Sequence, residues 1–191
     1  MNATTESKYA VKQDNMQFSK FIASSATRLG MALMAAGLFL AVPCAKAQTT
    51  VSIADTNFFF AAAQGGMTEV KLGELTSAHG MRADVKEFGQ MMVKDHTAIN
   101  DDLKALAAQK GVTLPGSLDA KHQAMVDKMT ALTGSEFDDT YINSMIKAHQ
   151  KDAKAFKAEA AATQDADIKS FLDKSIPIVE AHLKHVTALK K

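Results

Sequence analysis

Cysteine is nearly absent from this sequence. The only one among 191 residues is Cys44, which lies in a predicted leader described below. The residues after this leader, 48–191, therefore form neither a disulfide nor a metal site made of thiolates. Their folded state must be stabilised by packing.

Proline and the patterns of β-strands are also scarce. Only Pro115 and Pro177 follow residue 47, and no stretch alternates apolar and polar residues as a half-buried strand would. Ala, Leu, Lys, Glu, Gln and Met dominate this part of the chain, and most of them favour helices. The sequence therefore predicts an all-α protein.

An excess of charge is missing as well. The chain has 22 Lys and Arg against 21 Asp and Glu, and setting aside the five basic and two acidic residues of positions 1–47 leaves 17 against 19. A near-neutral domain lacks the basic surface that binding to phosphates requires. We therefore expect no nucleic acid as a partner.

The one long apolar run lies near the start of the chain. Residues 29–42 form an uncharged stretch that follows Lys20 and Arg28 and precedes a small-x-small pattern ending at Ala47. This order is typical of a signal peptide, and the run falls short of the roughly 20 residues that span a bilayer. We predict a signal peptide over 1–47, with translation starting at Met16 and cleavage after Ala47. The mature protein, 48–191, is then periplasmic and has no transmembrane span.

Four long amphipathic segments follow the leader. We expect helices over 55–79, 82–110, 135–162 and 165–189, with a short helix in the connection 111–134. The first and third should begin at the capping residues Asp55 and Ser135. Gly80 and Gly111 should end the first and second.

The lengths of the connections predict how these helices are joined. Two tight turns and one long middle connection give two helical hairpins linked by a crossover, which is typical of a ferritin-like four-helix bundle. We expect Pro177 to kink or break the last helix. The pair Gly65-Gly66 should allow a close backbone approach or mark a kink.

Each long helix has one ionisable residue in its apolar stripe, and these four are Glu69, His96, His149 and His182. Burying such groups singly is costly, so we expect them to meet near the middle of the bundle. Three imidazoles and a carboxylate suit zinc, iron, copper or manganese. A buried hydrogen-bond network without metal fits the same residues.

Other ionisable residues are weaker candidates. Asp95 and Glu180 should face solvent or support the site from behind, and the remaining three histidines after the leader, His79, His122 and His185, should lie at the surface. The usual di-iron pattern needs Glu-x-x-His on two helices, and the chain offers only a reversed imitation at 149–152. This argues against a standard ferroxidase centre.

The sequence also resembles a known family. The residues that carry the resemblance are Asp55, Phe58, Ala62, Gly65, Gly66, Glu69, Val70, Leu72, Gly73, Val85, Phe88, Met92, Val93, Asp95, His96, Phe137, Asp138, Tyr141, Met145, His149, Pro177, His182 and Leu183. Over residues 54–190 the chain is similar to the domain of unknown function 4142. The resemblance implies a ferritin-like, exported protein of a kind often labelled as outer-membrane, and it implies no reaction.

Two functions remain open at this point. The first is a periplasmic protein that binds a metal ion at Glu69, His96, His149 and His182, with a redox or stress-protective role. The second is a non-catalytic structural or interaction protein of the cell envelope, in which the same residues form a metal-free network that fixes the register of the helices.

Overall fold

The computed structural model describes residues 51–190, so the predicted signal peptide, the start at Met16 and the cleavage after Ala47 lie outside the described residues. Within 51–190 the protein consists of helices without strands, which confirms the all-α prediction. The helices are α1 (Ile53–His79), α2 (Ala83–Gln109), α3 (Ala120–Thr130), α4 (Gly134–Ala162) and α5 (Ala166–Leu189).

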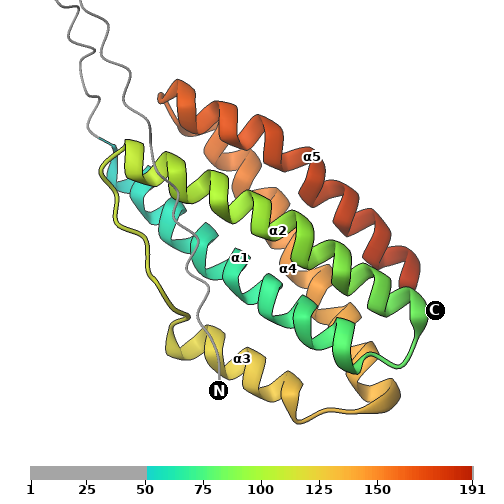
Figure 1. The fold of residues 1–191 in the computed structure, drawn as a ribbon. Helices are drawn as coiled ribbons and strands as arrows, with labels where there is room; N and C mark the ends of the chain where they lie inside the picture. Colours follow the sequence, from blue (N-terminus) through green and yellow to red (C-terminus); the bar gives the residue numbers. More distant parts are fainter. Residues whose placement is uncertain (1–50, 191) are drawn as a thin grey trace, which may run out of the picture. The chain divides into compact units, whose positions relative to one another are not determined.

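The four long helices form a bundle, and α3 lies on its outside (Figure 1). Helix α2 packs between α1 and α5, while α4 packs against α5 and α1, so that the four surround a common core. Helix α3 covers α1 and touches α4. None of the helices in residues 51–190 is long and apolar enough to cross a membrane.

The crossover between α2 and α4 gives the bundle its connectivity. The chain runs back along the bundle from the end of α2, forms α3, and then enters α4 in the same direction as α2 (Figure 1). The pairs α1–α2 and α4–α5 are antiparallel hairpins joined by tight turns. This is the ferritin-like arrangement that the connection lengths predict.

Two predicted helix starts are wrong by a few residues. Helix α1 is capped by Ser52, whose side chain accepts a hydrogen bond from the backbone of Asp55, and Asp55 itself completes the capping box. Both residues are good caps, and the earlier one adds most of a turn of helix. Helix α4 begins at Gly134 after Thr133, so Ser135 already lies inside it.

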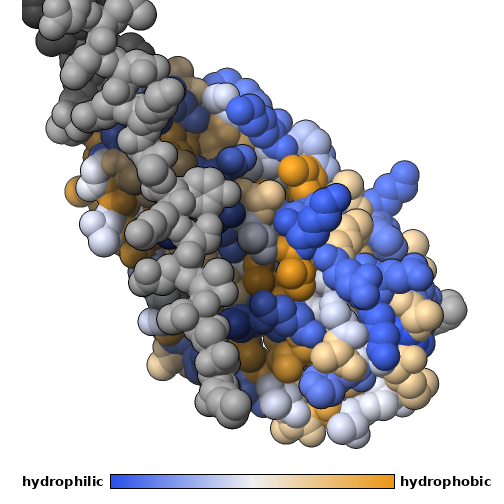
Figure 2. Space-filling view, viewed as in Figure 1, coloured by the Kyte–Doolittle hydropathy of each residue, from blue (hydrophilic) through white to orange (hydrophobic). Residues whose placement is uncertain are grey.

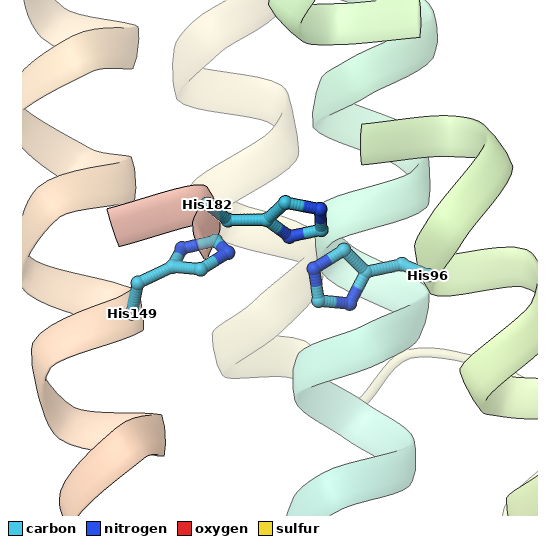
Figure 3. Close-up of side chains that lie close together, drawn as sticks. All are labelled: His96, His149 and His182. Carbon is cyan, nitrogen blue, oxygen red and sulfur yellow. The ribbon is translucent and has the colours of Figure 1, made fainter. Parts of the chain in front are cut away.

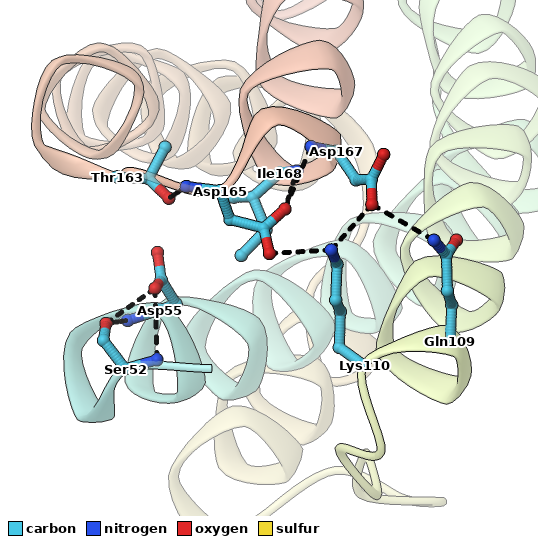
Figure 4. A network of polar contacts seen from close by, with 8 residues as sticks. All are labelled: Ser52, Asp55, Gln109, Lys110, Thr163, Asp165, Asp167 and Ile168. Carbon is cyan, nitrogen blue, oxygen red and sulfur yellow. Dashed lines mark hydrogen bonds and ion pairs between the residues drawn. The ribbon is translucent and has the colours of Figure 1, made fainter. Parts of the chain in front are cut away.

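The predicted start of α5 near Asp165 is confirmed, and Asp165 is its N-cap and belongs to a wider polar network. Asp165 accepts hydrogen bonds from the backbone of Asp167 and Ile168. The Nζ atom of Lys110, just after α2, lies 2.7 Å from a carboxylate oxygen of Asp165 and 2.7 Å from one of Asp167 (Figure 4). The end of α2 is thereby tied to the turn between α4 and α5.

Pro177 and the paired glycines differ in part from the expectations. Helix α5 is continuous through Pro177, so the predicted break is absent from it, and the alternative of a kink stays a prediction. The close backbone approach lies at Gly73 and Gly89, where α1 meets α2: a Cβ atom added to Gly73 would stand 2.8 Å from the carbonyl oxygen of Gly89. Gly65 has open space at its Cβ position instead.

The core consists of two apolar clusters with a polar layer between them. One cluster is built around Phe58, Phe59, Leu103 and Leu172, and the other around Leu72, Phe88, Met92 and Tyr141. On the face shown in Figure 2, exposed apolar side chains are interspersed with polar ones. In the polar layer, each long helix has one polar residue at an inward position, where the neighbouring inward positions are apolar.

Candidate metal centre

The polar layer is formed by the four residues that the sequence singles out. Glu69 on α1, His96 on α2, His149 on α4 and His182 on α5 are each at most 5% exposed. Each occupies the inward stripe of its helix between residues of the two apolar clusters. The helical period therefore explains why all four side chains point inward.

The three imidazoles form a nearly equilateral triangle. The ring centroids of His96 and His149 are 5.5 Å apart, those of His96 and His182 5.2 Å, and those of His149 and His182 5.5 Å. One nitrogen from each ring can be chosen so that all three lie within 4.8 Å of one another. Figure 3 shows the rings converging from three helices.

Each ring has one nitrogen held by a neighbouring oxygen. His96 Nδ1 lies 3.0 Å from Glu69 Oε2, His149 Nδ1 lies 3.0 Å from the carbonyl oxygen of Met145, and His182 Nε2 lies 3.0 Å from Asp95 Oδ2. A carbonyl can only accept, so His149 donates from Nδ1. Carboxylates favour the same role for the other two rings.

The second nitrogen of each ring is buried and has no hydrogen-bond partner among the described residues. These atoms are His96 Nε2, His149 Nε2 and His182 Nδ1. In a neutral ring whose opposite nitrogen carries the proton, each of these atoms offers a lone pair. Buried polar atoms are normally satisfied, so three orphaned acceptors at one place need an explanation.

Burial sets the electrostatics of this layer. It lowers the pKa of His96 well below its usual value, with a further contribution from the neighbouring His149 and His182. Burial, followed by the charge of His182, lowers the pKa of His149 to about 4. Both rings are therefore neutral near pH 7 and keep the lone pairs that a metal ion requires.

The carboxylate of Glu69 lies against two of the rings. Its Oε2 atom contacts His96, and its Oε1 atom is 3.6 Å from His149 Nδ1. Burial, together with the charge of Asp152, raises the pKa of Glu69 well above its usual value. Glu69 thus faces the Nδ1 atoms of His96 and His149, opposite to the orphaned Nε2 atoms.

The sequence gives only a partial account of the residues behind the rings. It leaves Asp95 either in solvent or behind the site, and the structure shows the second, because Asp95 bonds to His182. The sequence pattern did not indicate the Met145 carbonyl, which lies four residues before His149 and accepts a hydrogen bond from its ring. The four-residue spacing on a helix is the signal that could have pointed to it.

The other candidates behave as surface residues. His79 and His185 are exposed, and His122 is partly exposed and pairs with Asp119. Glu180 is exposed and forms an ion pair with Lys157. These positions confirm that only three of the histidines after the leader contribute to the buried layer.

A solved structure has a similar fold. The crystal structure of a DUF305 fragment from Deinococcus radiodurans matches with a TM-score of 0.64 and 10% sequence identity, covering 72% of this chain and 95% of the fragment. At this sequence identity the match shows only that the two folds are similar. No curated protein matches the sequence.

A family model matches residues 40–189, which include all five helices and the complete histidine layer. The description of this family names no reaction, in agreement with the resemblance found from the sequence. The chain therefore belongs to the family described as domain of unknown function (DUF4142).

Proposed function

We propose that the protein binds one transition-metal ion between α2, α4 and α5. The ligands are His96 Nε2, His149 Nε2 and His182 Nδ1. The observation that carries the proposal is that these three buried nitrogens lack partners within residues 51–190, while the other nitrogen of each ring is held by an oxygen. Histidines that bind metals are characteristically oriented by such a bond on their far side.

The donor set narrows the choice among zinc, iron, copper and manganese. Three neutral imidazoles without a thiolate suit zinc and copper well, whereas manganese prefers carboxylates and water. Three protein ligands also leave a coordination position open, as in zinc sites that bind a water molecule. We therefore propose zinc or copper as the first metals to test.

Glu69 has a supporting role in this proposal. Its carboxylate is placed to accept the Nδ1 proton of His96 and lies near Nδ1 of His149. In this position it orients the rings, and a bound cation would favour its charged form. The sequence-based hypothesis that Glu69 is itself a ligand stays a prediction, which spectroscopy of the bound metal can test.

A metal-free network is the second candidate, and two contacts favour it. Glu69–His96 links α1 to α2, and Asp95–His182 links α2 to α5, so both bonds oppose sliding of the helices. A network built only for this purpose would pair its remaining nitrogens as well. The three orphaned atoms make metal binding the better account.

Elemental analysis of the untagged protein tests the proposal directly. We expect up to one zinc or copper ion per chain and its loss in the variant His149→Ala. The matched control is His185→Ala, which removes an exposed histidine from α5 and should keep the metal. Absence of metal above background in the wild type, after incubation with zinc and copper, would contradict the proposal.

We also propose that the protein works in the periplasm. The support is the apolar run 29–42 with its basic and small-residue flanks, followed by a chain without cysteine. Mass spectrometry of the protein from fractionated cells should find a first residue at Gln48. Retention of the leader in the cytoplasmic fraction would refute this location.

A further inference from the structure

A small cavity opens beside the polar layer between α1, α2 and α4, and His122 of α3 also lines it. Its volume is about 90 Å³, and its inner wall includes Glu69 and His96. Its rim includes Ala61, Lys151 and Ala155, which are exposed. The cavity therefore links the surface to one of the three histidines and has room for several water molecules.

Oxygen atoms line this cavity from the rim to the interior. Asp152 is partly exposed, whereas Glu69 is buried, and Asn100 lies between the helices with its Oδ1 atom buried. Asn100 Oδ1 and Glu69 Oε1 have no hydrogen-bond partner among residues 51–190. A hydrated cation suits two buried acceptors that lack donors. Its water molecules can donate hydrogen bonds to them, and the oxygen atoms themselves can bind the cation.

Two glycines keep the passage open. A Cβ atom at Gly65 would meet nothing within 4 Å, so the missing side chain leaves free space at the cavity. A Cβ atom at Gly66 would stand 2.0 Å from Asn100 Oδ1, so this glycine makes room for the Asn100 side chain. Lys151 at the rim opposes a cation, but its charge is exposed and screened by solvent.

The larger grooves elsewhere on the protein do not offer an alternative route to the histidines. The groove of about 570 Å³ along the crossover is lined by residues such as Met67, Leu103 and Leu114, and by none of the three histidines. We propose that the cavity at Gly65 is the entry route of the metal ion, along which Asp152, Asn100 and Glu69 successively replace its water molecules before His96 binds it. This inference rests on the proposed metal site.

The rate of metal uptake tests the route separately from the site. Cobalt(II) is a suitable probe, because its visible absorption changes when nitrogen ligands replace water, and stopped-flow mixing with the untagged metal-free protein gives both rate and amplitude. In Gly65→Phe the new ring enters open space and fills the passage. We expect uptake about tenfold slower or more, with unchanged stoichiometry, because the ion must then wait for local opening of the helices.

A second variant and a control complete the experiment. Asp152→Asn should also slow uptake while the protein stays folded, since Asp152 is only partly buried. The control Ala78→Phe adds the same ring at an exposed position of α1 outside the cavity and should leave the rate unchanged. Wild-type rates in both Gly65→Phe and Asp152→Asn would overturn the route. Failure of the wild type to bind cobalt, zinc or copper at all would instead overturn the site.

Discussion

Asp95 and His182 lie 87 residues apart in the sequence, and a hydrogen bond of 3.0 Å joins Asp95 Oδ2 to His182 Nε2 between α2 and α5. The next residue after Asp95 is His96, whose ring belongs to the same triangle. Two consecutive residues of α2 thus serve the same centre, one by orienting a ring from α5 and the other through its own ring. This arrangement gives Asp95 a role that can be measured.

Replacing Asp95 by alanine should weaken metal binding while the three ligands remain. The variant frees His182 to rotate and to change tautomer, and loss of such a partner typically costs about 10–100-fold in affinity. Titration against a chromophoric chelator measures the change. The control Asp102→Ala removes an exposed carboxylate from the same helix and should bind as the wild type does. Equal affinities of Asp95→Ala and the wild type would show that this bond does not support the site.

Metal binding and fold stability should separate in the variant His149→Leu. In the metal-free protein, a leucine replaces a fully buried ring that has one orphaned nitrogen, so the free energy of unfolding should stay equal or rise. In the wild type, zinc at 100 times its dissociation constant should add about 2.7 kcal/mol, and in the variant it should add nothing. Urea denaturation with and without zinc measures both values.

The metal-free network makes the opposite prediction for this variant. If the imidazoles existed to fix the register of the helices, His149→Leu would lower stability strongly without any metal present. A large loss in the metal-free variant, together with no response of the wild type to zinc, would favour that second function.

The sequence predicts much of this architecture because the helical period is a strong signal. The apolar stripes indicate the four long helices and place Glu69, His96, His149 and His182 at inward positions. The turn lengths indicate the crossover. These features depend on local pattern and on chain length, which can be read without coordinates.

The hydrogen-bond partners of the individual atoms at the site cannot be predicted from such a pattern. The neighbour of each ring nitrogen depends on how the helices rotate against each other, which decides that Asp95 reaches His182. The glycines show the same limit, because Gly65, Gly73 and Gly89 all lie within helices and only the packing shows which two touch. The predicted start of a helix is wrong where two nearby residues could both cap it, as Ser52 and Asp55 could.

Glu159 should contribute stability at low pH that is lost when the pH rises through neutrality. Burial, followed by its hydrogen bond with Asp55 and the charge of that carboxylate, raises the pKa of Glu159 to about 7. A carboxyl group whose folded pKa is raised stabilises the fold when protonated, so this contribution is full below pH 4.5 and is lost as the pH rises through 7. Solvent access keeps the effect below about 1 kcal/mol.

The variant Glu159→Gln tests this dependence. Glutamine stays neutral, so the free energy of unfolding of the variant should rise relative to that of the wild type between pH 5 and pH 8, as measured by urea denaturation at several pH values. Glu136→Gln, which changes an exposed glutamate of the same helix, is the control and should follow the wild type. An unchanged slope in Glu159→Gln would rule out the shared proton between Glu159 and Asp55.

Two alanine substitutions in α1 should change stability in opposite directions. Gly65→Ala adds a methyl group to open space and should stabilise the protein by about 0.5–1 kcal/mol, because alanine loses less backbone entropy in a helix. Gly73→Ala gains the same propensity, but its methyl group would stand 2.8 Å from the backbone oxygen of Gly89, and the two helices must separate. A net loss of about 1–3 kcal/mol is expected from this overpacking, and urea denaturation of the metal-free proteins measures it. Equal effects at both positions would mean that α1 and α2 do not approach closely at Gly73.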